Sequence, residues 1–521
     1  MECSKVFQLK KYPNDIREVT LGSNITLNEI VAVARYGAKV HFSKEYVDRV
    51  NRYRGFVEAF AENNERVYGI TTGLGDNVKI TIDREKRKDI NRNHLRAHAT
   101  SVGEPATRES VRAMMIVMLS HMGNGHAAVS LNTLTQLKDM LNNGITPFVP
   151  KNGSVGYLTL ESHIALVMLG EGRAYVDSVL VDGDEALKLK GMKSIEADIK
   201  EGLSLVSGTT SVTAFGALAL YDAIQLAKTA DISAAMSLEV LKGTMMAFDE
   251  RIMKARPHVD QYNTASNVRS ILEGSEIVKK YEGYRVQDAL SLRCIPQLHG
   301  AAKKLINDAK TTMDIELNSS VDNPLIFEEE GRGISLMGCN ADGSYVGMSM
   351  DSINIAAANL GKMAERRTHR MVNSHVSELP PFLIEDPGFN NGFMMAQYTS
   401  AGLVGQMRLK SHPATIDNNI TCANQEDYLS MGYNASLQAY ENMAHLKYIL
   451  AIEIFHSVQA GDFYEESSSK GIERIRSLVR KEVPFITEDC NMNPYIEYIS
   501  SLIEDGTIVR TLEDETGEML F

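Results

Sequence analysis

The stretch "TTSVTAFGALALYDAIQLAKTADISAAMSLEVLKG", from Thr209 to Gly243, runs for about 35 residues without a proline and is rich in Ala, Leu and Met. A second stretch from Val346 to Asn373, "VGMSMDSINIAAANLGKMAERRTHRMVN", has the same character. Both exceed the roughly three to four turns of an average globular helix. They predict a mainly α-helical protein built around a long central helix bundle.

Shorter helices are expected around this bundle. The stretch from Ser43 to Asn64, "SKEYVDRVNRYRGFVEAFAENN", opens with a serine that suits a helix N-cap, and its apolar residues recur at helical spacing. Strand-like pieces are short and few, such as residues 79–82 and 335–337. The glycine- and threonine-rich "YGITTGLGDN" at 68–77 predicts a mobile loop.

Changes in this pattern divide the chain into three predicted parts. Residues 1–208 make a small mixed N-terminal region that contains the loop, and residues 209–481 make the long-helix bundle. In residues 482–521, proline and acidic residues interrupt the helical pattern. We expect this last part to pack as a C-terminal cap.

Composition excludes several classes of protein. The 521 residues are 44% hydrophobic and 7% aromatic, which is ordinary for a soluble globular chain. The net charge of -13 comes with no basic block, so nucleic acid is a poor partner. No apolar run is long enough for a membrane span, and the N-terminus lacks a secretion signal. Five scattered cysteines without a CxxC pair argue against disulfides and structural zinc, so we expect a cytoplasmic protein without a metal.

A series of short motifs lies between Val67 and Gly432, namely "VYGITTGLG", "NHLRAHATSVGEP", "GSVG", "QDALSLRCIPQLHG", "DNPLIF", "EDPGFNNGFMMAQYTSAGL", "HPATID" and "TCANQEDYLSMG". The series resembles the aromatic amino acid lyase family, which includes histidine and phenylalanine ammonia-lyases and related aminomutases. Each motif alone is weak, but together and in order they are specific. The resemblance implies the helical fold of histidine ammonia-lyase, a small-molecule substrate, and a homotetramer whose active sites are shared between subunits.

The centre of the family's catalytic frame is different in this chain. In the family, consecutive Ala, Ser and Gly residues cyclise into an electrophilic methylidene-imidazolone, which takes up the substrate amine. The glycine nitrogen attacks the carbonyl two residues back, and the serine hydroxyl leaves as water. The matching residues here are Tyr157, Leu158 and Thr159. Leucine has no hydroxyl to eliminate, so this route cannot make the group, and we expect no cofactor.

Further departures agree with this loss. The asparagine that steadies the family's prosthetic group is Ser207 here, in "LVSGTT". The tyrosine between the glutamine and arginine motifs is Leu290, and the phenylalanine that usually follows Asn340 is Ala341. The resemblance places all of these changes on the electrophile side of the site.

Other matched groups are intact. Tyr68 matches the family's catalytic tyrosine, which removes a proton from the substrate's Cβ; it could instead be an ordinary loop tyrosine. Arg293, in "SLRC", matches the arginine that holds the substrate carboxylate, a task that suits its two-pronged donor set, although a structural ion pair is the alternative. Gln287, Asn340 and Gln425 match polar groups around the same site.

His98 and Glu426 bear on the substrate ring. A histidine occupies the position of His98 in the family's histidine-specific branch, and Glu426 matches a carboxylate that faces the ring. Together they can pair with the nitrogens of an imidazole, whereas a phenyl ring would leave both unpaired. An imidazole-like ring is therefore favoured. The alternative for His98 is a core histidine whose hydrogen bonds are satisfied within the protein.

A site that keeps a base and a carboxylate clamp but lacks an amine activator suits a leaving group that needs no activation, such as a quaternary ammonium. The chain resembles the family's prosthetic-group-free ergothionase branch, which splits ergothioneine into thiourocanate and trimethylamine. Tyr157, Leu158 and Ala341 would then shape a partial aromatic cage for the cation, unless Tyr157 merely fills a void. An ammonia-lyase or aminomutase acting on an ordinary amino acid, and a catalytically silent binding or regulatory paralogue, remain alternatives.

Overall fold

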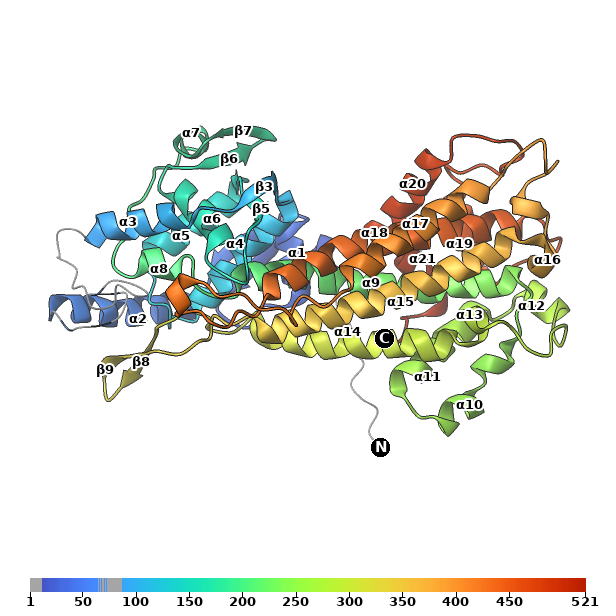
Figure 1. Cartoon of the computed structure of the whole chain (residues 1–521), viewed down its shortest axis with the longest axis horizontal. Helices are drawn as coiled ribbons and strands as arrows, with labels where there is room; N and C mark the ends of the chain where they lie inside the picture. The colour runs from blue at the N-terminus through green and yellow to red at the C-terminus, as the bar shows by residue number, and fades with distance from the viewer. Residues whose placement is uncertain (1–11, 64, 66, 68–69, 71, 73–86) are drawn as a thin grey trace.

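The computed structural model describes residues 12–63, 65, 67, 70, 72 and 87–521. The chain is elongated, with long helices running along its length (Figure 1). Residues from the N-terminal part gather at one end of these helices, where most of the short strands also lie. The predicted mainly α-helical fold with a long central bundle is confirmed.

Five long helices make the bundle: α9, α14 and α15 pack directly against one another, and α18 packs on α9 and α15. Nearly every residue of α9 is buried, which is why this helix is apolar all round rather than amphipathic. The two stretches without proline, which were predicted to be long helices, form α9 and α15. The five are α9 (Thr210–Val240), α14 (Ile295–Glu316), α15 (Ser344–Val372), α17 (Met394–Lys410) and α18 (Gly432–Gly461).

Several of the N-terminal helices begin at residues whose side chains cap the helix, as their sequences predict. Ser43 accepts a hydrogen bond from the Tyr46 N–H at the start of α2, and Thr107 and Ser130 cap α4 and α5 in the same way. The helices are α1 (Leu27–Ala34), α2 (Lys44–Glu62), α3 (Arg87–His98), α4 (Arg108–Gly123), α5 (Leu131–Asn142), α6 (Thr159–Met168), α7 (Gly183–Leu189) and α8 (Glu201–Ser204).

The strands are short and form small separate sheets. β1 (Glu18–Leu21) and β2 (Lys39–Phe42) are parallel, while the other pairings, β3 with β5, β4 with β6, β6 with β7, and β8 with β9, are antiparallel. The predicted strand at 335–337 overlaps the end of β9, and the one at 79–82 lies outside the described residues. The remaining strands are β3 (Val102–Pro105), β4 (Thr146–Pro147), β5 (Pro150–Asn152), β6 (Arg173–Val176), β7 (Val179–Asp182), β8 (Leu325–Glu329) and β9 (Arg332–Leu336).

The remaining helices cover the other end of the bundle. Within residues 482–521, α20 packs on α18, and α21 packs on α19 and α9. The chain end is held by the Leu520 carbonyl, which accepts from the Asn267 Nδ2 at 2.8 Å. These helices are α10 (Glu250–Ala255), α11 (Val259–Ile271), α12 (Glu276–Lys280), α13 (Leu290–Arg293), α16 (Ser374–Ser377), α19 (Lys470–Val479), α20 (Asn493–Glu504) and α21 (Thr507–Thr516).

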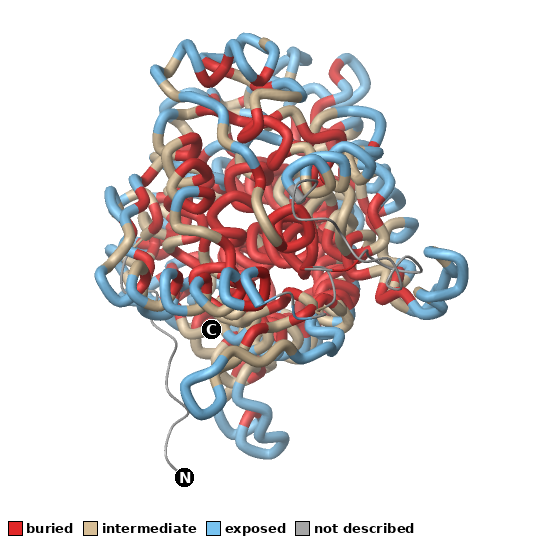
Figure 2. The backbone as a smooth tube through the Cα atoms, turned by 90° about the vertical axis from the view of Figure 1, so that its left-hand side faces the viewer, coloured by how far each residue is buried: buried red, intermediate tan, exposed pale blue. Residues whose placement is uncertain are grey.

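The interior of the bundle is buried, and exposed residues lie around it (Figure 2). Charged residues inside it are paired: Asp231 accepts from Lys303 Nζ at 2.6 Å, and Arg367 binds Glu453. Pairing offsets the large cost of burying a charge. Across the described part of the chain, no helix combines the length and the apolarity that crossing a membrane requires.

Candidate active site

The modified tripeptide forms the start of α6. Leu158 caps this helix with φ of 81°, in the left-handed region that a branched side chain rarely adopts. Its N–H donates to the Val206 carbonyl at 3.2 Å, and its own carbonyl accepts from Ser162 Oγ at 2.8 Å. These two bonds fix the tripeptide beside the segment that leads into α9.

The residues present do not fit the methylidene-imidazolone group. Ring closure requires the amide nitrogen of Thr159 to attack the carbonyl carbon of Tyr157, but Thr159 is β-branched and is the first residue of α6. The Tyr157 carbonyl accepts a hydrogen bond from Ser154 Oγ at 3.4 Å. Leu158 supplies no hydroxyl to eliminate. No chemical step is therefore assigned to this group.

Tyr157 lies near Glu426, which is far away in the sequence. The Glu426 carboxylate accepts a hydrogen bond from Thr421 Oγ1 at 2.6 Å and acts electrostatically on the Tyr157 hydroxyl. The backbones of Thr421 and Glu426 pair as an isolated antiparallel bridge, which fixes the position of the carboxylate. Burial raises the pKa of the Tyr157 phenol, and Glu426 raises it further, so this phenol is neutral at physiological pH.

The surroundings of Tyr157 are acidic. The charged side chains that act most strongly on it are Glu426 and Asp342, and the Cys339 thiol lies with them. Burial raises the pKa of the Cys339 thiol, and the two carboxylates add to this effect. Asp342 Oδ1 accepts from the Ser344 N–H at 3.1 Å at the start of α15. The sequence reasoning missed Cys339 and Asp342; their only signal was that both flank Asn340 and Ala341.

Ser207, Asn340 and Gln425, three other predicted site residues, differ in how far they are buried. Ser207 is buried next to Val206, whose carbonyl holds Leu158. Asn340 is exposed and donates through Nδ2 to the Ser320 carbonyl at 3.1 Å. Gln425 is exposed in the turn just before Glu426.

Ala341 is buried in the loop before α15, between Cys339 and Asp342. A phenylalanine here would carry a much larger side chain into the same buried setting. That the small residue widens the space near the tripeptide stays a prediction from the sequence.

His98 is the last residue of α3, which packs against α6 and α8. Its Nδ1 lies 2.7 Å from the His94 carbonyl, which can only accept, so Nδ1 carries the proton and Nε2 is left as an acceptor. The two rings stack at a tilt, with centroids 3.9 Å apart. Burial, and then His98, lower the pKa of His94 to about 3, so His94 is neutral. His98 is half-buried, with one nitrogen already satisfied within α3.

Arg293 and Gln287 are not brought to Tyr157 within one chain. Arg293 ends α13, which packs on α14 and α15 at the far end of the long helices from α6 (Figure 1). Among the described residues, Arg293 Nε is buried without a hydrogen-bond partner. Gln287 is exposed, and Leu290 is 61% exposed. Of the two predicted site residues, Gln287 is thus exposed and Arg293 is half-buried.

Tyr68, the predicted base, lies outside the described residues, together with most of its 68–77 loop. Its placement relative to Tyr157 and Glu426 stays a prediction from the sequence.

Comparison with known proteins identifies the relatives of this chain. The family model for aromatic amino acid lyase matches residues 25–481. A histidine ammonia-lyase of Streptococcus pyogenes serotype M1 is 39% identical over 499 residues, which cover 94% of this chain and 97% of that protein. The solved histidine ammonia-lyase of Trypanosoma cruzi has a TM-score of 0.90 at 32% identity, covering 95% of both chains.

A solved ergothionase also has a similar fold. Ergothionase from Treponema denticola, solved with desmethyl-ergothioneine sulfonic acid, has a TM-score of 0.87 at 26% identity, covering 94% of this chain and 99% of that one. The sequence match, the structural match and the order of the motifs all agree. The chain belongs to the aromatic amino acid lyase family and is thereby a member of a family of carbon–nitrogen lyases.

Proposed function

We propose that the protein eliminates a tertiary amine from a trimethylammonium betaine with an imidazole-like ring, with ergothioneine as substrate and thiourocanate and trimethylamine as products. One observation carries the proposal. The position of the family's electrophile is taken by Tyr157 and Leu158, and the carboxylates Glu426 and Asp342 act electrostatically on the Tyr157 side chain. An aromatic ring with carboxylates near it suits a permanent cation that offers no N–H donor.

Elimination of trimethylamine from a betaine needs no electrophilic group on the protein. A base removes the proton from the substrate's Cβ, the Cα–N bond breaks, and its electron pair leaves with trimethylamine while a Cα–Cβ double bond forms. A primary amine would leave poorly in this way unless it were first activated. A quaternary nitrogen departs as a neutral molecule, so the site needs only to hold the cation, remove the proton and bind the carboxylate.

We assign these tasks to separate groups. Tyr68 is the base, Arg293 binds the substrate carboxylate, and His98 and Glu426 pair with ring nitrogens. His98 has Nε2 available as an acceptor, which supports its part. Because Arg293 lies at the opposite end of the bundle from Tyr157, a second subunit of a cytoplasmic homotetramer would supply it.

A second candidate is an ammonia-lyase or aminomutase that acts on histidine or another aromatic amino acid. The 39% identity to a histidine ammonia-lyase favours it, since this exceeds the 26% identity to the ergothionase. Against it stands Leu158, which supplies no hydroxyl for an amine-activating group. A catalytically silent binding or regulatory paralogue is the third candidate, but such a protein has no need of a buried Arg293 Nε that lacks a partner among the described residues.

One assay separates the three candidates. The purified protein is incubated with ergothioneine, hercynine, histidine and tyrosine, and the appearance of an unsaturated product is followed in the near ultraviolet. We expect turnover of a betaine and release of trimethylamine. Turnover of histidine or tyrosine alone would establish the second candidate, and no turnover of any compound would establish the third. Light scattering on the same sample tests the tetramer, which a monomer at micromolar concentration would contradict.

A further inference from the structure

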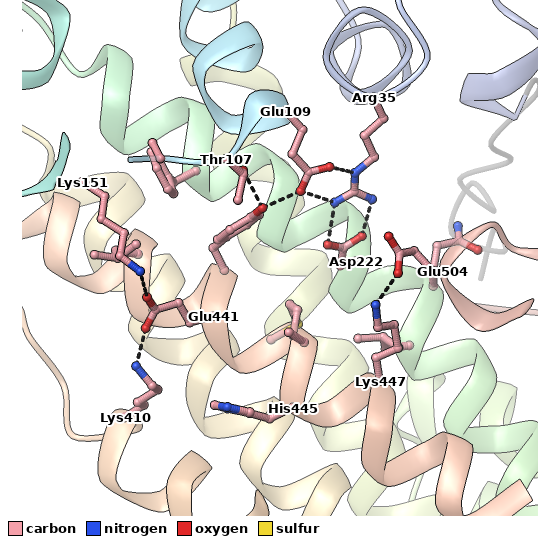
Figure 3. Close-up of a pocket in the computed structure, with 18 of the residues that line it drawn as sticks. Arg35, Thr107, Glu109, Lys151, Asp222, Lys410, Glu441, His445, Lys447 and Glu504 are labelled. Carbon is pink, nitrogen blue, oxygen red and sulfur yellow. Dashed lines mark hydrogen bonds and ion pairs between the residues drawn. The ribbon is translucent and has the colours of Figure 1, made fainter. Parts of the chain in front are cut away.

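A cavity of about 470 Å³ lies where the N-terminal region meets the bundle (Figure 3). Its walls come mainly from Arg35, the segment before α4 and its first turn, and from α9, α18 and α20. Within the described residues, it shares no lining residue with the candidate active site. Its volume falls within the range of pockets that bind small molecules, roughly 300–1,000 Å³.

Asp222 of α9 is the centre of a charged group that lines this cavity. Both of its carboxylate oxygens accept from Arg35, at 2.6 and 2.7 Å (Figure 3). The same guanidinium donates through Nε to Glu109 Oε2 at 2.5 Å. One cation is thus shared by two carboxylates. The group of Arg35, Asp222 and Glu109, here called the acidic triad, has a formal charge of −1.

A nearby lysine does not cancel this charge. Lys447 of α18 also lines the cavity, but its Nζ binds Glu504 Oε2 of α20 (Figure 3). Burial raises the pKa of the Asp222 carboxyl, although Arg35 and Lys447 act in the opposite direction. A further cation beside Asp222 would therefore stabilise its ionised form.

Gln225 places an unused acceptor next to Asp222. The two residues are three positions apart on α9, so their side chains are neighbours on one face of this helix. Gln225 lines the cavity and is only 7% exposed, and its Oε1 is buried without a hydrogen-bond partner within the described residues. A buried acceptor without a donor is destabilising, so a bound N–H group at this place would be stabilising.

Apolar side chains line the cavity beside these polar groups. Leu226 follows Gln225 on α9 and lies one helical turn from Asp222. Ile503 precedes Glu504 on α20, which packs on both α9 and α18. These surfaces suit a hydrocarbon body rather than a second charged group.

The other charged group of the cavity does not favour a cation. Glu441 accepts from Lys151 Nζ at 3.1 Å and also binds Lys410, so these three residues have a formal charge of +1. Figure 3 shows them apart from Asp222. A cation is therefore favoured only at the acidic triad.

We propose that Asp222 and Gln225 bind a protonated primary amine that has an apolar body and no carboxylate. The ammonium donates one N–H to Asp222 and another to Gln225 Oε1, which neighbouring side chains on one helix face allow. Each Asp222 oxygen keeps an acceptor position beyond its bond to Arg35. The hydrocarbon part lies against Leu226 and Ile503. A quaternary ammonium carries the charge but no N–H, so it binds more weakly.

A series of three probes tests this chemistry on the unchanged full-length protein by calorimetric titration. 2-Phenylethylamine is a primary amine with an apolar body and no carboxylate, and we expect it to bind. Its N,N,N-trimethyl derivative keeps the charge without an N–H, and 2-phenylethanol is neutral, so each should bind about tenfold more weakly or worse. Equal affinity for the amine and its trimethyl derivative, or no binding of the amine up to about 10 mM, overturns the proposal.

Substitutions then locate the bound amine. Asp222→Asn removes the net charge of the acidic triad and leaves the Arg35–Glu109 pair. Gln225→Met removes the acceptor but keeps an unbranched side chain. We expect each to weaken amine binding about tenfold or more, whereas Gln225→Glu keeps an acceptor and should bind at least as tightly as the unchanged protein.

Asp184→Asn is the matched control, because it neutralises an exposed carboxylate of α7 that pairs with Lys188, and it should bind the amine as the unchanged protein does. Melting temperatures show which variants are folded, and the probe series needs no variant. The proposal is overturned if a folded Asp222→Asn or Gln225→Met variant binds the amine like the unchanged protein. It is also overturned if Tyr157→Leu, at the candidate active site, abolishes amine binding. None of these results depends on whether the protein cleaves ergothioneine.

Discussion

Tyr157 lies near Glu426, whose carboxylate raises the pKa of the Tyr157 phenol and accepts a hydrogen bond from Thr421 Oγ1 at 2.6 Å. An aromatic ring and a carboxylate thus stand together at the place where the family builds its electrophile. This proximity brings the start of α6 next to the loop before α18, although the two segments are far apart in the sequence.

Replacing Tyr157 tests whether its ring holds a cation. Tyr157→Leu should weaken binding of the betaine by about two- to thirtyfold, because a ring face near a cation contributes about 0.5–2 kcal/mol. It should leave the affinity for urocanate, which has no cation, unchanged. Tyr157→Phe keeps the ring and should keep the betaine affinity. If Tyr157→Leu weakens both ligands equally, or weakens neither, the ring only fills space.

The tripeptide should be chemically unmodified. Because Leu158 has no hydroxyl to lose, the intact mass should equal that of the unmodified chain, and the peptide containing residues 157–159 should show no dehydration. Mass spectrometry of the whole protein and of its digest measures both. A dehydrated peptide would mean that a prosthetic group forms by another route.

Tyr68→Phe tests the assigned base. Loss of the phenol should lower turnover by about 10²–10⁴-fold, since proton removal from Cβ then has no acceptor, while binding of the substrate should survive. Turnover and equilibrium binding are measured on the same preparation. Near-normal turnover of the variant would assign the base to another residue.

Mixing inactive variants tests the shared site. If Arg293 from one subunit serves the Tyr68 of another, Tyr68→Phe and Arg293→Ala chains that are unfolded and refolded together should regain activity. Random assembly restores about a quarter of the sites. Each variant refolded alone is the control. No recovery in the mixture, with mixed tetramers confirmed by native mass spectrometry, would place both residues in one subunit's site.

Acid should destabilise the fold through buried neutral histidines. His456 lies in α18 with its Nδ1 at 2.7 Å from the Ile452 carbonyl, and burial lowers its pKa to about 4 from an ordinary 6.5. His121 is shifted to about 4 by burial as well. Both protonate more readily in the unfolded chain, so stability is full above about pH 6.5 and falls as the pH drops towards 4, by on the order of 3 kcal/mol for each histidine.

Thermal unfolding of the protein and of His456→Gln across this range measures the effect. The variant should lose less stability between about pH 6.5 and pH 4, because the group that takes up the proton has been removed. Parallel curves for the two proteins would show that His456 does not titrate on unfolding.

Much of the fold was predictable because it depends on local chemistry. The long helices followed from the absence of proline over residues 209–243 and 346–373, and the start of α2 followed from the cap at Ser43. The loss of the electrophile could also be predicted from the sequence, since it depends on the identity of one side chain, Leu158. The predicted strand at 335–337 was only partly right, because short strands depend on their partners more than on their own residues.

The sequence by itself determined that this chain has the helical fold of its family and lacks a hydroxyl at the centre of the catalytic tripeptide. Only the tertiary structure decided which distant groups meet there. It placed Tyr157 near Glu426, Cys339 and Asp342, and it placed Arg293, at the end of α13, at the other end of the bundle. The physical reason is that electrostatic interactions depend on separation in space, and the path of the chain between two residues sets that separation.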